Sequence, residues 1–187
     1  VTDGDNDQIV NSVDAVSPLS LTISDTNPTL TVTGDPTFSA LSVVEASGAG
    51  GSQTVQITAP TYTASAVDGY TDSVSYALST VEGAATGLQT TNGNYAITLH
   101  QVDANTIQGV YNGSNVAFTI TLSGSSVTLT SSVALEHANG PQNTESDTLN
   151  LGTLVNVVAT VTVTDGDNDQ IVNSVDAVSP LSLTISD

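Results

Sequence analysis

The sequence of 187 residues contains 19 acidic residues and neither lysine nor arginine, which gives a formal net charge of −19 at pH 7. This charge repels nucleic acid and anionic lipid surfaces, so we expect neither as a partner unless metal ions bridge the contact. Hydrophobic residues make up 38% of the chain and cysteine is absent, which predicts a folded domain without disulfides or thiolate metal sites.

The first 25 residues of the chain recur unchanged at residues 163–187, a period of 163 − 1 = 162 residues. Such identity indicates a tandem array, in which the partners of each unit are neighbouring identical repeats of the same chain. Pro28 cannot continue a strand ladder, so we place the seam in SDTNP. Residues 1–25 are then the tail of the preceding repeat and residues 26–187 one complete repeat. A competing seam at DGDND would run the unit from about Ile9 to Val163.

Apolar residues alternate with Thr or Ser along most of the chain, the period-two pattern typical of half-buried strands. We therefore predict an all-β fold, an antiparallel β-sandwich of the immunoglobulin-like kind. The predicted strands cover residues 29–33, 40–46, 53–59, 73–79, 95–100, 106–111, 116–122, 126–135, 148–151, 154–164 and 181–186.

Two of these segments carry specific expectations. In the strand 154–164, Val157, Ala159, Val161 and Val163 form one apolar face, which predicts that this face is packed. The last strand, 181–186, is expected to pair back on it. The N-terminal copy lacks its upstream partner strand, so we expect it to pack on a neighbouring molecule or along the sandwich edge.

Three aspartates alternate in the sequence DGDND, and this cluster occurs in both copies. Carboxylates at positions i, i+2 and i+4 turn toward one centre when a loop winds around it, and Ca²⁺ takes oxygen ligands. Because no basic residue can balance these charges, we expect Ca²⁺ as the cofactor and a calcium-stabilised sandwich. The alternative is a plain turn, since Asp, Gly and Asn are common turn residues. The candidate ligands are Asp3, Asp5 and Asp7 in the first copy and Asp165, Asp167 and Asp169 in the second.

An acidic residue at the twelfth place of each cluster, Asp14 or Asp176, makes the pattern approach an EF-hand loop. Gln8 or Gln170 stands where that loop needs glycine, and strands replace the helices, so we infer Ca²⁺ but no EF-hand. Asp14 and Asp176 remain candidate ligands.

Further candidate ligands lie near the predicted seam. Asp25, its copy Asp187, and Asp35 could join a cation across neighbouring repeats, or they could be ordinary solvated carboxylates. Asp68 and Asp72 are expected in a turn beside Gly69.

The supply of catalytic groups argues against an enzyme. The two histidines are His100 and His137, and no nucleophile motif such as G-x-S-x-G is present. We expect His100 to pack or to form a hydrogen bond. We predict neither catalysis nor a small-molecule substrate.

The segment 131–169, SSVALEHANGPQNTESDTLNLGTLVNVVATVTVTDGDND, resembles the end of repeats in giant type I secreted, RTX-type adhesins of Gram-negative bacteria. Residues 134–137 match the ALEH element and residues 164–169 the TDxDGD motif, with Asn168 in place of a glycine. The resemblance implies an extracellular, Ca²⁺-stabilised extender repeat of an outer-membrane-anchored adhesin. Such repeats form a stalk that holds an adhesive tip away from the cell in biofilm formation.

Two functions follow as hypotheses. In the first, the repeat is a structural spacer, stiffened by Ca²⁺ at each seam, without direct membrane insertion. In the second, it is a glycan- or protein-binding module that uses the loops between Val67 and Gly93, with Tyr62, Tyr70 and Tyr76 gathered at one end.

Overall fold

A computed structural model describes residues 12–13, 17, 20–44, 51–136, 146–150, 154–177 and 182–186, with the backbone alone at 146–150 and 182–186. Within these ranges the chain forms fifteen strands and no helix. Accordingly, no helix that could span a membrane is found among them. The prediction of an all-β fold is confirmed.

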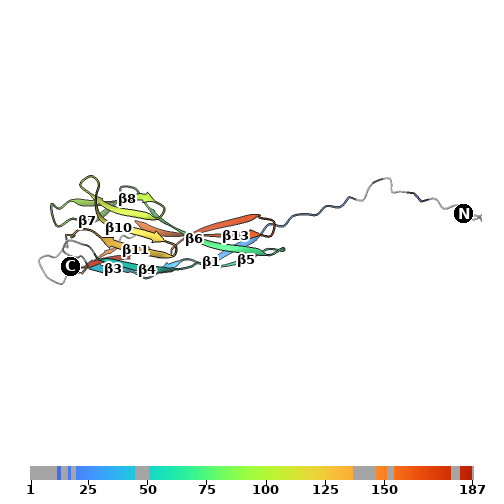
Figure 1. Ribbon diagram of the computed structural model, residues 1–187, viewed down its shortest axis with the longest axis horizontal. Helices are drawn as coiled ribbons and strands as arrows, with labels where there is room; N and C mark the ends of the chain where they lie inside the picture. Colours follow the sequence, from blue (N-terminus) through green and yellow to red (C-terminus); the bar gives the residue numbers. More distant parts are fainter. Residues whose placement is uncertain are drawn as a thin grey trace, which may run out of the picture.

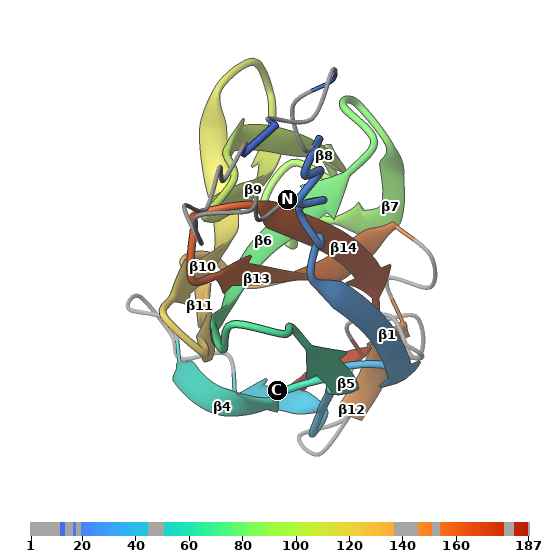
Figure 2. The ribbon, with the colours of Figure 1, turned by 90° about the vertical axis from the view of Figure 1, so that its right-hand side faces the viewer.

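The largest sheet has seven strands and curls around one side of the molecule (Figure 2). Each neighbouring pair within it is antiparallel. Its order is β2 (Thr37–Phe38), β4 (Ser52–Thr58), β11 (Ser126–Ser131), β10 (Asn115–Ser123), β9 (Thr106–Tyr111), β8 (Ala96–Asp103) and β7 (Ala85–Gln89).

Three smaller sheets complete the sandwich. One has the order β14 (Gln170–Asp176), β13 (Val155–Asp165), β6 (Tyr70–Thr80), and a second pairs β1 (Thr29–Gly34) with β5 (Thr61–Ser65). The third has the order β12 (Ser146–Asn150), β15 (Ser182–Ser186), β3 (Leu41–Val44). The pair β15–β3 is parallel, in contrast to the antiparallel pairs of the other sheets.

The core lies between the seven-stranded sheet and strands β3, β6 and β13. Its largest fully buried side chains include Phe118, Leu41, Leu99 and Ile120. Burying this apolar surface is the main stabilising term, since each fully buried side chain of this size contributes roughly 1.5–3 kcal/mol.

Strand β13 carries the clearest signature of the fold. Its residues alternate between buried and half-buried over the whole length of the strand. Val157, Ala159, Val161 and Val163 are fully buried, which confirms the predicted packed face. The strand pairs with β6 on one side and with β14 on the other. Strand β13 is therefore the central strand of its sheet, and it ends at Asp165.

Most predicted strands are present, with ends shifted by a few residues. The sequence prediction missed β2, β5, β7 and β14. The expectation that residues 181–186 pair with 154–164 was wrong: β15 pairs with β12 and β3. The physical reason is that both edges of β13 are already occupied by β6 and β14.

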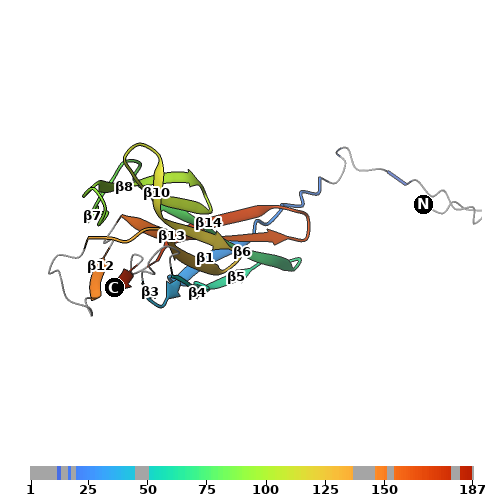
Figure 3. The same ribbon diagram turned by 60° about the vertical axis from the view of Figure 1, so that its left-hand side comes forward.

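The two copies of the duplicated sequence differ in structure. Residues 182–186 form β15 between two strands, whereas residues 20–24, with the same sequence SLTIS, form no strand. Leu21 is 79% exposed and Ile23 85% exposed. The described residues before Pro28 lead away from the sandwich along its long axis (Figures 1 and 3). Residues 20–24 therefore do not lie along the sandwich edge, so that part of the expectation was wrong; packing on a neighbouring molecule stays a prediction.

Candidate metal centre

The buried face of β13 ends in a carboxylate. Asp165 continues the every-second-residue series of buried valines, and it is only 6% exposed. Asp165 Oδ1 accepts a hydrogen bond of 2.8 Å from the backbone N–H of Asp169. Among the described residues, Asp165 Oδ2 is the one buried side-chain N or O atom without a hydrogen-bond partner. Because the chain contains no lysine or arginine, this charge has no side-chain cation to balance it.

The turn between β13 and β14 folds back over Asp165. The backbone N–H of Asp165 donates to the carbonyl of Asp169 at 3.1 Å, which closes the hairpin. Asn168 has a φ of +78°, a left-handed conformation that Asn tolerates better than most residues. This turn brings Asp167 and Asp169 to the same side as Asp165.

A second turn contributes Asp68. Strand β6 pairs with β13 in a register that sets Tyr70 opposite Asp165, so the turn before β6 lies beside the turn after β13. A carboxylate oxygen of Asp68 lies within 4.8 Å of one from Asp165 and one from Asp167. The two turns thus form the first group of three carboxylates.

The segment that leads into β1 contributes Asp25. Its carboxylate joins those of Asp167 and Asp169 in a second group of three, again within 4.8 Å of one another. Pro28 is buried. Asn27 and Pro28, together with the beginning of β14, line a hollow of about 420 Å³ next to this group. Asp167 belongs to both groups, so five carboxylates form one continuous cluster.

The crowding of negative charge changes the acidities of two of these groups. Hydrogen bonding with Asp165 and then Asp25 raises the pKa of Asp167 from 3.8 to about 6. Loss of water contact, followed by the charges of Asp25 and Asp165, raises the pKa of Asp169. Both shifts record that the metal-free cluster resists carrying its full negative charge.

The donor set fits a hard divalent cation. All the converging groups are carboxylate oxygens, the ligands that Ca²⁺ takes in sets of six to eight. Asp165 Oδ2 has no hydrogen-bond partner, and the close contact of Gly166 with Asp68 brings a second carboxylate beside it, so a bound cation would neutralise charge that no lysine or arginine can balance. These oxygens offer no soft ligand, which disfavours copper and other thiophilic ions.

The comparisons with known proteins bear on this segment of the chain. The profile of the DUF5801 family, a domain of unknown function, matches residues 21–178. The chain belongs to this family. The matched DUF5801 segment includes all five carboxylates of the cluster. Neither a curated protein nor a solved structure matches the chain.

Other sequence-predicted ligands of the DUF5801 domain lie elsewhere. Asp35 is exposed and follows β1, whereas Asp25 of the cluster precedes this strand. The six residues of β1 place Asp35 about 20 Å from the start of the strand. Asp176 is exposed and pairs with Val158, while the turn lies at the opposite end of the β13–β14 hairpin. A strand in place of the expected loop carries Asp176 away from Asp165. The candidates Asp3, Asp5, Asp7, Asp14 and Asp187 lie outside the described residues.

Sequence reasoning missed Asp68 as a member of the cluster. It predicted the turn beside Gly69 correctly for Asp68, but not that the turn meets DGDND across the sheet. For Asp72 the prediction of a turn was wrong, because Asp72 lies within β6 and pairs with Val163. The signal was present in Gly166, whose lack of a side chain permits the approach of Asp68.

The other polar residues singled out from the sequence have ordinary partners. His100 Nδ1 lies 2.7 Å from Glu82 Oε1, which confirms the expectation of a hydrogen bond. That contact lowers the pKa of Glu82. The hydroxyl of Tyr62 donates to Asp72, which raises the pKa of Tyr62 to about 12.

Proposed function

We propose that this DUF5801 domain is a calcium-binding structural repeat, an extender in the stalk of a large adhesin on the cell surface. The stalk would project a ligand-binding tip for cell adhesion and biofilm formation. The observation that carries the proposal is the buried carboxylate of Asp165, which has a free Oδ2, lies beside the carboxylates of Asp68 and Asp167, and has no lysine or arginine to balance it.

The position of Asp25 supports a site that acts at a joint. This residue precedes β1 in the segment that continues from the N-terminal copy of the repeated sequence. In a tandem array, the last strand of one repeat would lead through residues 25–28 into the next. A cation held by Asp25, Asp167 and Asp169 would then tie the linker to the β13–β14 turn and restrict bending between repeats.

The shape of the molecule supports the same arrangement. The N-terminal segment leaves one end of the long axis and β15 lies toward the other (Figure 1). Units joined in this way add length head to tail, as in other quasi-one-dimensional repeat proteins. The acidic cluster stands at the end from which the N-terminal segment departs.

The surroundings of the protein follow from the resemblance to RTX-type adhesins. A chain without cysteine and without basic residues suits type I secretion in the unfolded state and folding outside the cell, where Ca²⁺ is plentiful. At low Ca²⁺ the carboxylates repel one another and oppose folding. The role is structural and not enzymatic.

Thermal melts of the 187-residue chain in excess Ca²⁺, in excess Mg²⁺ and in chelator test the metal. A ligand that binds the folded state at about 100 times its Kd stabilises it by about 2.7 kcal/mol. We expect a rise of several degrees with Ca²⁺ and a smaller one with Mg²⁺, which binds reluctantly to all-protein carboxylate cages. Identical curves in Ca²⁺ and chelator would sink the proposal.

The stiffening role needs a second measurement. Small-angle X-ray scattering of two consecutive repeats should give a longer, narrower particle in Ca²⁺ than in chelator. Asp25→Asn in the linker between the repeats should remove the difference, while Asp35→Asn should retain it. An equal particle length with and without Ca²⁺ would contradict the stiffening of the joint, while the proposal that Ca²⁺ stabilises each repeat would stand.

A further inference from the structure

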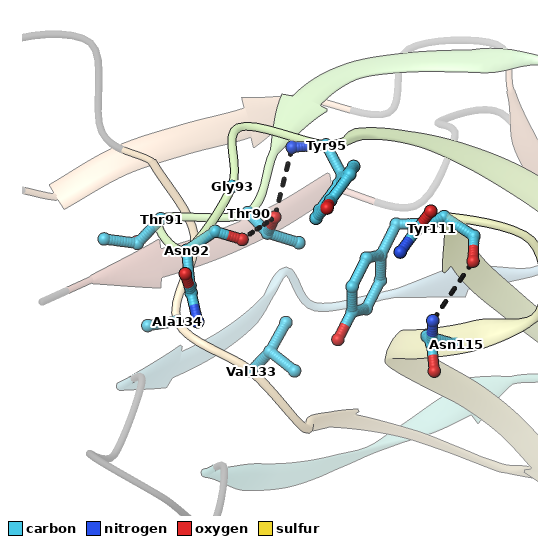
Figure 4. A pocket seen from close by; sticks show the side chains of 10 residues that line it. Thr90, Thr91, Asn92, Gly93, Tyr95, Tyr111, Asn115, Val133 and Ala134 are labelled. Carbon is cyan, nitrogen blue, oxygen red and sulfur yellow. Dashed lines mark hydrogen bonds between the residues drawn. The ribbon is translucent and has the colours of Figure 1, made fainter.

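A pocket of about 550 Å³, drawn from close by in Figure 4, opens at the end of the sandwich away from the acidic cluster. It is bounded by the segment after β7, by the β9–β10 hairpin and by residues 133 and 134 after β11. In Figure 1, β7 lies at the opposite end from the N-terminal segment. The volume falls in the range of about 300–1,000 Å³ that is typical of small-molecule sites.

Two tyrosines form the apolar part of the pocket. Tyr95 and Tyr111 come from neighbouring hairpins, and their ring centroids are 6.1 Å apart with planes inclined at 30°. Tyr95 is 42% exposed, whereas Tyr111 is half-buried against the core. Figure 4 shows both rings turned toward the space that Val133 closes from the other side. The rings offer two faces of different depth to a bound molecule.

The walls of the pocket are held by hydrogen bonds. Buried Thr90 donates its hydroxyl to the carbonyl of Asn92 and accepts from the backbone N–H of Tyr95. The backbone N–H of Thr91 donates to the carbonyl of Ala134 at 3.2 Å, which joins two of the walls. These hydrogen bonds hold the walls in place before a ligand binds. The loss of conformational entropy on binding is therefore smaller.

Gly93 permits the Tyr95 ring to lie against the backbone. Its φ is +88°, and a side chain at this position would overlap the ring. The Tyr95 ring therefore lies directly over the backbone of Gly93. The ring thus forms part of the pocket wall in the ligand-free structure.

The polar groups of the pocket are neutral and available. Within the part of the chain that the structure describes, neither phenolic hydroxyl of Tyr95 and Tyr111 makes a hydrogen bond, and neither does the side-chain amide of Asn92. Asn115 donates through Nδ2 to the carbonyl of Asn112, which leaves its Oδ1 free to accept. Among the lining residues that the structure describes, none carries a charged side chain.

We propose that this pocket binds a neutral glycan. Sugar rings present apolar C–H faces that pack on aromatic rings and hydroxyls that pair with amides and phenols, which matches both kinds of group here. The net charge of −19 and the absence of any basic residue disfavour sialylated or uronic sugars. The site shares no residue with the acidic cluster and does not use Tyr62, Tyr70 or Tyr76. In a tandem array it recurs with every repeat, so weak binding at each copy would add up through avidity.

The test is saturation-transfer difference NMR of the 187-residue chain in Ca²⁺ buffer, with lactose, maltotriose, mannotriose and chitotriose as probes. We expect saturation transfer from at least one neutral sugar at millimolar concentration. If lactose binds, 3′-sialyllactose should bind more weakly. Tyr95→Ala should weaken binding by on the order of tenfold, since it removes the exposed ring. Tyr111→Phe keeps the ring and should weaken binding less.

Tyr70→Ala is the matched control, because Tyr70 is 45% exposed but lies outside the pocket. Thermal melts of all three variants check folding, and Tyr111→Phe keeps the test informative if Tyr95→Ala unfolds. No transfer from any of the four sugars would overturn the proposal. The same holds if Tyr95→Ala binds as well as the parent chain, or if Tyr70→Ala loses as much affinity. Binding of an unstructured peptide at the pocket in place of every sugar would assign the site to protein recognition and overturn it as well.

Discussion

Gly166 lies directly against the carboxylate of Asp68: a Cβ atom on Gly166 would stand 2.5 Å from Asp68 Oδ2 and 3.0 Å from the Asp68 backbone oxygen. This contact joins the turn before β6 to the turn after β13. The geometry of the five-carboxylate cluster therefore depends on a position that carries no functional group.

Gly166→Ala should push Asp68 away from Asp165 and weaken Ca²⁺ binding. Losing one carboxylate from a set of five lowers the charge available to the ion, and we expect a Kd higher by on the order of tenfold. Isothermal titration with Ca²⁺ measures the change. Ser114→Ala, in an exposed hairpin turn at the other end of the sandwich, is the control and should leave the Kd unchanged. An unaltered Kd in Gly166→Ala would show that Asp68 is no ligand.

Asp165→Asn should have opposite effects with and without metal. The amide keeps the acceptor for the Asp169 N–H but removes a buried charge that no lysine or arginine balances in the metal-free protein. In chelator we expect a gain of about 1–3 kcal/mol, which is a rise in Tm of several degrees. In Ca²⁺ the variant should lose the metal-dependent rise of the parent chain.

Asp176→Asn is the matched control for this experiment. It changes an exposed aspartate at the far end of the β13–β14 hairpin, and both melts should follow those of the parent chain. A lower Tm of Asp165→Asn in chelator would mean that the carboxylate is stabilised without an ion, contrary to the metal site proposed here.

The stability of the metal-free protein should fall as the pH rises from about 4 to 7. The pKa of Asp167 is about 6 in the folded state against 3.8 ordinarily, so its protonated form favours the fold. That contribution is complete below 3.8 and is lost as the pH passes through about 6. Melts in chelator at several pH values measure the slope, and Asp167→Asn should flatten it. In Ca²⁺ the slope should reverse, because protons compete with the ion for the carboxylates.

The two copies of SLTIS allow a proline test with an internal control. Thr184 lies within β15, between β12 and β3, and Thr22 is the same residue of the N-terminal copy outside any strand. Thr184→Pro removes a ladder donor inside a sheet, so we expect a loss of about 1–3 kcal/mol and a Tm lower by several degrees. Thr22→Pro should leave the Tm of the same chain unchanged. Equal melts of the two variants would contradict the pairing of β15.

The strand content could be predicted from the sequence because alternation at period two is a local signal. The buried face of β13 is the clearest case, since a single stretch of residues specifies it. The alternation of buried residues in β13 extends to Asp165, so the same pattern could have predicted that this carboxylate is buried. Strand β14 was missed because the DGDND pattern suggested a longer binding loop up to Asp176.

Partners that are distant in the sequence could not be predicted in the same way. To predict that Asp68 meets Asp165, one must know the register between β6 and β13. To predict where β15 pairs, one must know that β6 and β14 already occupy both edges of β13. The two conformations of SLTIS make the general reason plain: the same five residues form a strand only where two neighbouring strands supply hydrogen bonds.

The parallel pairing of β15 with β3 also determines how the domain responds to mechanical load. Leu183 lies opposite Leu41 and Ser186 opposite Val44, so the chain enters β3 and leaves β15 at opposite ends of the same ladder. Tension along a stalk would pull these two strands past each other lengthwise. All the hydrogen bonds between them would then be loaded together and would not open one at a time, as in a hairpin that is peeled apart. If the domain forms part of the proposed stalk, this pairing of β15 with β3 would help it to resist tension.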